Sequence, residues 1–356
     1  MIAAENINIT KAERSKLKDI NLENIPFGKY FTDHMLEVDY EDGEWKNAEI
    51  KPYQPLRLDP SLAGIHYGQS IFEGIKAYKN AAGEAFIFRP IDNFKRFNIS
   101  AERMQMPQVP EDIFMEGMRM LIELDKNWIP QQEDHSLYIR PFMFSSDHMI
   151  GVRPSEKYKF MIILSPTGPY YSEPMRIYVE EKYVRAVPGG VGFAKAAGNY
   201  GGAMYATAQA KAKGYDQVLW TDAFEHKYVQ ECGTMNIFFI IGNTAITPDL
   251  HEGTILAGVT RNSTMVLLKE MGFQVEERGI SIDDVIAAHK AGILYEVFGT
   301  GTAATISLIK ELRYKDYVME FNVNNWKTAP AIKSRLNEIR YGQVPDTHNW
   351  MVKICR

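Results

Sequence analysis

The sequence has few cysteines, no long apolar run and no excess of charge of one sign. Only Cys232 and Cys355 occur among 356 residues, far apart and without a zinc-type or C-x-x-C spacing, and the eight histidines are scattered. Apolar runs such as residues 237–241 are much shorter than the roughly 20 residues that span a bilayer. The 40 Lys and Arg against 45 Asp and Glu give a formal charge of −5. We therefore expect a protein of the reducing cytoplasm with no metal centre, no membrane segment and no nucleic-acid partner.

The length and the distribution of proline and glycine predict two domains. A domain usually has about 150 residues, and residues 165–174 contain three prolines and one glycine, as a linker would. We expect a first, smaller domain over residues 1–165, which begins with an extended arm of about fifty residues. A linker over residues 166–176 and a larger second domain over residues 177–356 should follow.

Hydrophobic periodicity predicts mixed α/β (α+β) domains. In the first half, helices should begin at Pro90 and Glu111, and strands should cover residues 71–78, 85–88, 136–144 and 158–164. In the second half, strands are expected at residues 176–187, 217–220, 235–241, 245–247 and 293–298. Helices there should cover residues 201–213, 260–271, 282–291 and 329–340. Ser281 and Asp284 have the spacing of a capping box.

One lysine has surroundings unlike those of the others. Lys195 lies in the stretch Gly-Phe-Ala-Lys-Ala-Ala-Gly-Asn-Tyr-Gly and has no charged neighbour from Ala186 to Ala210. Burial among small uncharged residues lowers the pKa of a lysine and frees its amine to act as a nucleophile. The alternative is a surface lysine in a glycine-rich loop, and the segment alone leaves both interpretations open.

Two further features suit the chemistry of pyridoxal phosphate. Glu231 leads into the apolar run 237–241, and a buried carboxylate needs a cationic partner. A protonated pyridine nitrogen would serve, although a structural ion pair is the more common arrangement. The segment 256–261 opens a predicted helix with Thr260 as its expected cap, and residues 299–302 form a Gly/Thr turn. Either segment could hold a phosphate on its free amide groups.

Several strings in order along the chain resemble the class IV (fold-type IV) aminotransferases, and among them the branched-chain amino-acid aminotransferases of the longer type. The most specific are E-x-G-T-x-N-I-F from Glu231 and G-T-I-L-x-G-V-T-R from Gly253, and the others include residues 66–78, 136–141 and 195–201. The resemblance implies two mixed domains of the fold-type IV pyridoxal-phosphate-dependent fold. It also implies a homodimer and the cofactor pyridoxal 5′-phosphate.

The resemblance assigns roles to individual residues. It implies that Lys195 carries the cofactor covalently, that Glu231 meets the pyridine nitrogen and that Tyr200 binds the ring 3′-oxygen. The residues that would hold the phosphate are Arg89, Arg185, Val259, Thr260 and Thr302. The residues that would contact the substrate are Tyr67, Phe72, Tyr138, Arg140, Tyr170, Thr234 and Ala303. In this family such a tyrosine holds the α-carboxylate, and such an arginine holds the side-chain carboxylate of glutamate.

The expected activity is transamination of L-leucine, L-isoleucine and L-valine with 2-oxoglutarate, which yields branched-chain 2-oxo acids and L-glutamate. One alternative is another enzyme of the same fold, a D-amino-acid transaminase or an aminodeoxychorismate lyase, which should not need the Tyr138-x-Arg140 pair. The other is a non-catalytic ligand-binding protein of this fold. The presence of Lys195 disfavours that second alternative.

Overall fold

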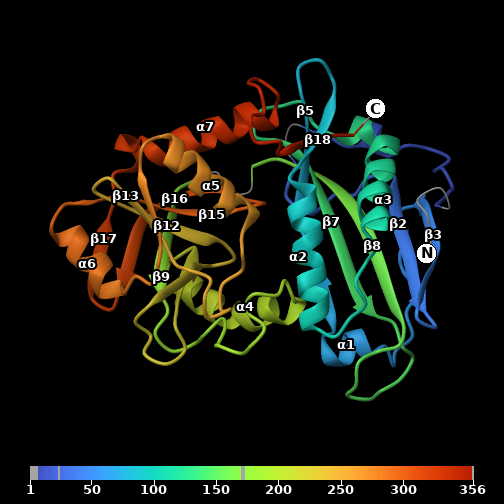
Figure 1. The fold of residues 1–356 in the computed structure, drawn as a ribbon, viewed down its shortest axis with the longest axis horizontal. Helices are drawn as coiled ribbons and strands as arrows, with labels where there is room; N and C mark the ends of the chain where they lie inside the picture. The colour runs from blue at the N-terminus through green and yellow to red at the C-terminus, as the bar shows by residue number, and fades with distance from the viewer. Residues whose placement is uncertain (1–6, 23–24, 170–172, 355–356) are drawn as a thin grey trace. The chain divides into compact units, whose positions relative to one another are not determined.

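The computed structural model describes residues 7–22, 25–169 and 173–354, and the chain divides into two compact units (Figure 1). Unit 1 comprises Met1–Tyr170, Ala194–Ala197 and Asn337–Arg356, and unit 2 comprises Tyr171–Phe193 and Gly198–Leu336. Both units mix helices with β-sheet, as the sequence predicted. The sequence expectation differs in one respect, because it assigned residues 194–197 and 337–356 to the second domain.

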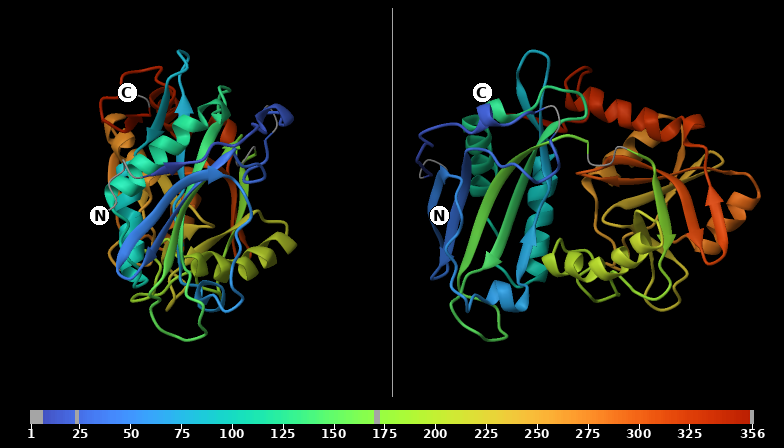
Figure 2. Two further views of the ribbon diagram at one scale, coloured as in Figure 1. Left: turned by 90° about the vertical axis from the view of Figure 1, so that its right-hand side faces the viewer. Right: turned by 180° about the vertical axis from the view of Figure 1, so that it is seen from behind.

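The described part of unit 1 is built on a nine-stranded sheet in the order β1-β3-β2-β8-β7-β5-β6-β18, with β4 paired to β7. The strands are β1 (Asn8–Ile9), β2 (His34–Glu41), β3 (Glu44–Pro52), β4 (Ser70–Phe72), β5 (Ile75–Lys79), β6 (Ala85–Phe88), β7 (Ser136–Ser145), β8 (Tyr158–Thr167) and β18 (Met351–Lys353). The helices are α1 (Ala63–Tyr67), α2 (Pro90–Arg103), α3 (Glu111–Leu124) and the 3-10 turns η2 (Leu17–Asp19) and η3 (Lys126–Trp128). Helices α2 and α3 lie side by side on one face of this sheet (Figures 1 and 2).

The helices of unit 1 follow from their sequence pattern. Pro90 starts α2, where its fixed φ and missing N–H suit the first turn. Phe97 and Ala101, four residues apart, are fully buried, and Phe97 packs at 5.5 Å from Phe114 of α3 and at 5.5 Å from Phe160 of β8. The apolar faces of the two helices therefore form the core with the sheet.

Two expectations about unit 1 are wrong. The first fifty residues are not an extended arm, because β2 and β3 form a hairpin and β2 also pairs with β8. Five consecutive β2 residues, 34–38, are buried, so the strand lacks the alternation that reveals a strand in a sequence. The strand expected at residues 71–78 is interrupted at Glu73 and Gly74, where β4 ends and β5 begins. The C-terminal residues belong to unit 1 because β18 pairs antiparallel with β6.

Across the described residues of unit 2, the sheet is again nine-stranded, in the order β11-β10-β9-β16-β15-β12-β13-β14, with β17 paired to β16. The strands are β9 (Met175–Val179), β10 (Gln217–Thr221), β11 (Val229–Cys232), β12 (Asn236–Ile241), β13 (Thr244–Thr247), β14 (Gln274–Glu277), β15 (Leu294–Gly301), β16 (Thr305–Tyr314) and β17 (Tyr317–Glu320). The remaining helices of the chain are α4 (Ala197–Ala212), α5 (Val259–Glu270), α6 (Ile282–Lys290), α7 (Thr328–Arg340) and the 3-10 turn η4 (Val323–Asn325).

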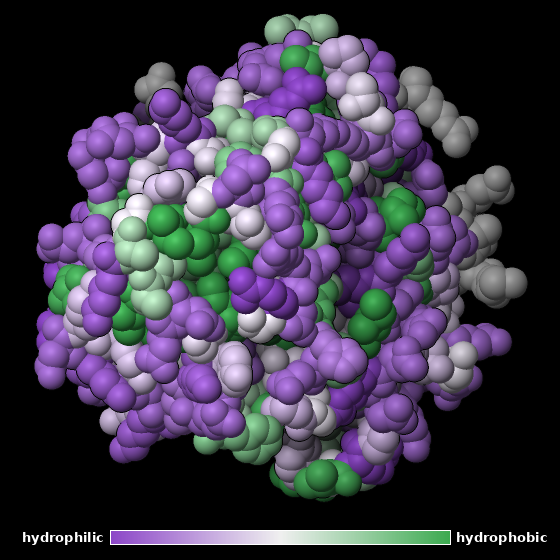
Figure 3. Space-filling model, turned by 60° about the vertical axis from the view of Figure 1, so that its left-hand side comes forward, coloured by the Kyte–Doolittle hydropathy of each residue, from purple (hydrophilic) through white to green (hydrophobic). Residues whose placement is uncertain are grey.

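The helix boundaries in unit 2 agree with the sequence to within a few residues. The predicted capping box is present, since Asp284 N–H donates to Ser281 Oγ (3.0 Å) and Ser281 N–H donates to Asp284 Oδ2 (3.1 Å). The strand expected at residues 176–187 already ends at Val179. Within the described ranges, no helix is both long and apolar enough to cross a membrane. On the face drawn in Figure 3, small groups of apolar side chains lie among polar ones.

Candidate active site

Lys195 is held by unit 1. The Phe72 N–H donates to the Lys195 carbonyl (3.1 Å), and the Lys195 N–H donates to Ser100 Oγ (2.9 Å). The next residue, Ala196, forms an antiparallel bridge with Ile71. The lysine segment therefore lies alongside strand β4, and the Lys195 amine is 5.0 Å from the centre of the Phe72 ring.

Three of the predicted substrate residues meet near this lysine. Tyr138 and Arg140 face the same side of β7, as their spacing predicted, and Arg140 Nη2 donates to Tyr138 Oη (2.8 Å). The Arg140 guanidinium also lies 4.6 Å from the centre of the Phe72 ring. Gly74 is required here, because a Cβ at this position would be 2.2 Å from Tyr138 Oη. Unit 1 thus places an amine, an aromatic ring, a phenol and a guanidinium together.

The other predicted residues of unit 1 are not drawn into this group by any contact described here. Tyr67 ends α1 and is 42% exposed. Arg89 precedes α2 in the left-handed region (φ 48°), which costs a residue with a side chain about 1–3 kcal/mol. Its Nε donates to Asp92 (2.8 Å), and its guanidinium lies 5.4 Å from the Trp350 ring. Tyr170 lies outside the described residues.

In unit 2, Glu231 is buried on β11 and paired with Arg185. Arg185 Nε lies 3.0 Å from Glu231 Oε2, in the geometry of an ion pair rather than a directed hydrogen bond. Glu231 Oε1 accepts the Leu256 N–H (2.8 Å), and Arg185 donates to the carbonyls of Gly192 (3.1 Å) and Thr254. The ion pair that the sequence left open is therefore present. It also shows that Glu231 Oε2 accommodates a cationic nitrogen at about hydrogen-bond distance.

Four of the predicted unit 2 residues line one small hollow: Arg185, Tyr200, Glu231 and Thr234. Asn199 also lines it and donates to the Val191 carbonyl (2.9 Å), so it ties the start of α4 to the preceding loop. Cys232, next to Glu231, is fully buried. Burial, and then the charge of Glu231, raise the pKa of its thiol to about 12, so Cys232 is no nucleophile at neutral pH.

The predicted phosphate cradle begins at Gly258. Gly258, not Thr260, caps α5, and Thr260 lies inside the first turn at 3% exposure. The cap carries no side chain because a Cβ there would be 2.0 Å from Asn236 Oδ1, so the first amides of α5, Val259 among them, meet no side-chain cap. Asn236 pairs in turn with Thr300, whose buried Oγ1 has no hydrogen-bond partner among the described residues. Free amides and an orphaned hydroxyl fit an anion such as a phosphate.

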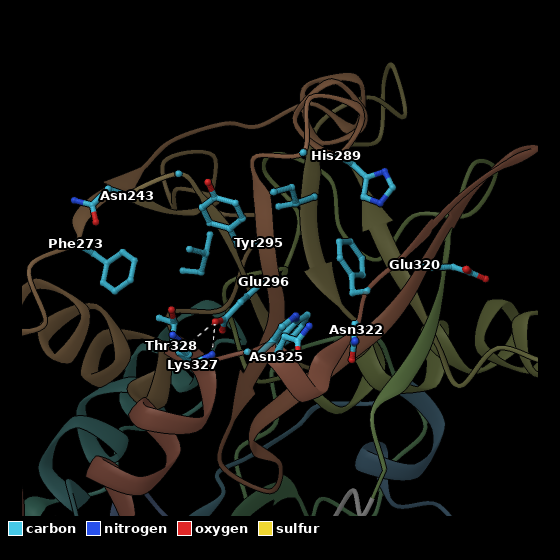
Figure 4. A pocket seen from close by; sticks show the side chains of 16 residues that line it. Asn243, Phe273, His289, Tyr295, Glu296, Glu320, Asn322, Asn325, Lys327 and Thr328 are labelled. Atoms are coloured by element: carbon cyan, nitrogen blue, oxygen red, sulfur yellow. Dashed lines mark hydrogen bonds between the residues drawn. The ribbon is translucent and has the colours of Figure 1, made fainter.

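Thr302 and Ala303 lie in the turn between β15 and β16, directly after this strand end. A separate hollow of about 580 Å³ in unit 2 contains none of the predicted residues (Figure 4). Its buried acid, Glu296, accepts the N–H groups of Lys327 and Thr328 (both 2.8 Å) and so caps the start of α7. That carboxylate has a structural role.

Sequence reasoning missed several residues around these groups. Glu73, Asn93, Arg96 and Ser100 form a buried network beside Lys195, and Asn236 joins α5 to β15. An acid between Phe72 and Gly74 in an otherwise apolar stretch was a signal that could have been used. Glu73 is 0% exposed and therefore had to have a partner.

Comparisons with known proteins agree with this arrangement. The family model for class IV amino-transferases matches residues 70–312, and the chain belongs to that family. A probable branched-chain-amino-acid aminotransferase of Staphylococcus aureus (strain N315) is 47% identical over 360 residues, which cover 99% of each chain. Branched-chain-amino-acid transaminase 1 of Bacillus subtilis (strain 168) is 48% identical over 337 residues, 93% of this chain and 94% of that one.

Solved structures give the same answer for the fold. The branched-chain amino acid aminotransferase of Escherichia coli has a TM-score of 0.75 at 25% identity and covers 91% of this chain and 99% of its own. A branched-chain amino acid aminotransferase of T.th. solved with pyridoxamine 5′-phosphate has a TM-score of 0.72 at 26% identity, over 89% and 98%. The predicted family and fold class are confirmed.

Proposed function

We propose that this chain transfers the amino group of L-leucine, L-isoleucine or L-valine to 2-oxoglutarate with pyridoxal phosphate as cofactor. The observation that carries the proposal is the group formed by Lys195, Phe72, Tyr138 and Arg140 in unit 1. It combines a nucleophilic amine with an apolar wall and two donors for carboxylates. The names of the relatives support the substrates, and the pyridoxamine phosphate in a solved relative supports the cofactor.

The residues fit the cofactor. Lys195 would carry it covalently, Tyr200 would bind the ring 3′-oxygen, and Glu231, already beside a cationic nitrogen at 3.0 Å, would face the pyridine nitrogen. When bound, pyridoxal phosphate supplies an electron-poor ring that accepts the electron pair released at the Cα of the amino acid.

The phosphate would bind to Arg89, Thr302 and the amides of Val259 and Thr260. Arg185 was predicted to join them, but its guanidinium is engaged by Glu231 and two carbonyls. We assign Arg185 to holding the Glu231 carboxylate in its charged form.

Lys195 also acts as the acid and base. Once the substrate amine takes its place, the freed Lys195 amine removes the proton from Cα and returns it on the neighbouring carbon of the cofactor. Phe72 offers an apolar surface to a branched side chain, and Arg140 offers hydrogen bonds to the side-chain carboxylate of glutamate. Tyr138, with Ala303, would hold the α-carboxylate. One set of side chains can thus accept both substrates.

We propose a homodimer as well. Helix α1 and the loop around residue 150 are neighbours, because Ala63 N–H donates to the Asp147 carbonyl (3.3 Å). Together they expose four large apolar side chains: Ile65 (62%), Tyr67 (42%), Ile150 (66%) and Val152 (89%). A second copy would cover such a surface. Light scattering of active enzyme should give twice 40.7 kDa, and a single-chain mass would contradict the dimer.

A substrate panel tests the proposed reaction. Purified protein with pyridoxal phosphate and 2-oxoglutarate should form glutamate from L-leucine, L-isoleucine and L-valine. Preference for D-amino acids would favour the D-amino-acid transaminase instead. Pyruvate formed from aminodeoxychorismate would favour the lyase, and a protein that binds the cofactor without turnover would be the non-catalytic alternative.

A further inference from the structure

A buried ion pair joins strand β4 to helix α2 directly beside the Lys195 segment. Glu73 follows the last residue of β4, and Arg96 of α2 donates to both its oxygens, from Nε to Oε1 (2.7 Å) and from Nη2 to Oε2 (2.8 Å). Asn93 and the Gly74 N–H also donate to Oε2, at 2.8 and 3.1 Å. Burial alone would raise the pKa of Glu73, but the charge and hydrogen bonds of Arg96 outweigh it and lower that pKa. The carboxylate is therefore charged and fully satisfied.

Ser100 connects this pair to Lys195. It lies one helical turn after Arg96, is 0% exposed, and donates its hydroxyl hydrogen to the Arg96 carbonyl (3.0 Å). Its lone pair is thereby directed to the Lys195 N–H, which it accepts at 2.9 Å. On the other side, the Phe72 N–H that donates to the Lys195 carbonyl (3.1 Å) comes from the residue directly before Glu73. Both main-chain groups of Lys195 are held by residues next to the ion pair.

The lysine segment needs such support because it supplies little of its own. Residues 192–198 contain two glycines and three alanines, which offer few side-chain contacts and a flexible backbone. The position of the Lys195 amine therefore depends on where the main chain is held. A misplacement of about 1 Å at a reacting group can cost on the order of 100-fold in rate.

We infer that Ser100, fixed by the Glu73–Arg96 pair, is a positioning residue that sets the place of Lys195. The inference rests on the proposed function of Lys195. Ser100 itself touches neither substrate nor cofactor. It acts through the Lys195 main chain, so its loss should change catalysis without removing a substrate contact.

The first test measures amide hydrogen exchange at Lys195 in the cofactor-free, full-length protein. Ser100→Ala should raise the exchange rate of the Lys195 amide at least tenfold, and Ser100→Thr, which restores a hydroxyl, should return most of the protection. The matched control is Ser145→Ala, because Ser145 is also fully buried in unit 1 but its hydroxyl has no hydrogen-bond partner among the described residues. Unchanged exchange in Ser100→Ala, or an equal rise throughout α3, would overturn the inference.

The second test uses the holoenzyme. Ser100→Ala should lower kcat roughly 10- to 100-fold with KM for leucine changed less than about twofold, since substrate contacts remain. Faster exchange with an unchanged kcat would also refute the inference. Failure of the proposed function is recognised separately, because Lys195→Ala would then keep its activity whatever the exchange data show.

Discussion

Replacement of Arg140 by Met should separate the two kinds of substrate. Met keeps much of the length and apolar surface against the Phe72 ring, where the guanidinium now lies at 4.6 Å, but it removes the charge and the donors. Arg140 has no ion-pair partner among the described residues, and its Nε is buried without a hydrogen-bond partner, so capacity remains for an incoming carboxylate. A charge-assisted hydrogen bond contributes about 1.5–3 kcal/mol. At about 1.4 kcal/mol per tenfold, this corresponds to roughly 10- to 150-fold.

The assay compares kcat/KM for glutamate and 2-oxoglutarate with that for leucine. We expect the loss of roughly 10- to 150-fold only for the dicarboxylic substrates, because leucine offers no second carboxylate. The control is Arg176→Met on β9, where the arginine is paired with Glu311 (2.8 Å) and should affect stability alone. Equal losses for leucine and glutamate together with a lowered Tm would show that Arg140 is structural, and would refute the reasoning.

Three further variants test the catalytic and structural assignments. Lys195→Ala should keep the fold, checked by circular dichroism, but lose more than a thousandfold in turnover, about 4 kcal/mol of barrier; a smaller loss would exclude Lys195 as the acid and base. Glu231→Gln should slow the proton-transfer half-reaction in stopped-flow experiments more than it weakens cofactor binding, because a neutral amide cannot keep a pyridine nitrogen protonated. Glu73→Gln leaves Arg96 buried without its counter-charge and should cost about 3–5 kcal/mol in urea unfolding at pH 7. Because the folded pKa of Glu73 is lowered, its contribution is present above the unfolded value of about 4.3 and is lost as pH falls through the folded pKa. The variant should therefore lose less stability on acidification than the wild type, and equal losses would contradict the assignment.

Local patterns in the sequence were enough for features that involve only neighbouring residues. The apolar spacing of Phe97 and Ala101 predicted the buried face of α2, and the pair Ser281 and Asp284 predicted the start of α6. Tyr138 and Arg140 were expected on one side of a strand, and they are hydrogen-bonded there. These features follow from helix and strand periodicity, which extends over a few residues and is therefore legible in the sequence.

The tertiary structure alone decided which distant segments meet. The Lys195 amide binds Ser100, 95 residues away, and Met351–Lys353 completes a sheet begun near the other end of the chain. Glu231 was expected to be buried, but its pairing with Arg185 depends on loops from separate parts of unit 2. Strand β2 was missed because both its faces are covered, which removes the alternation that marks a strand. Such contacts arise from the packing of whole sheets and helices, and no pattern within a short stretch of sequence encodes them.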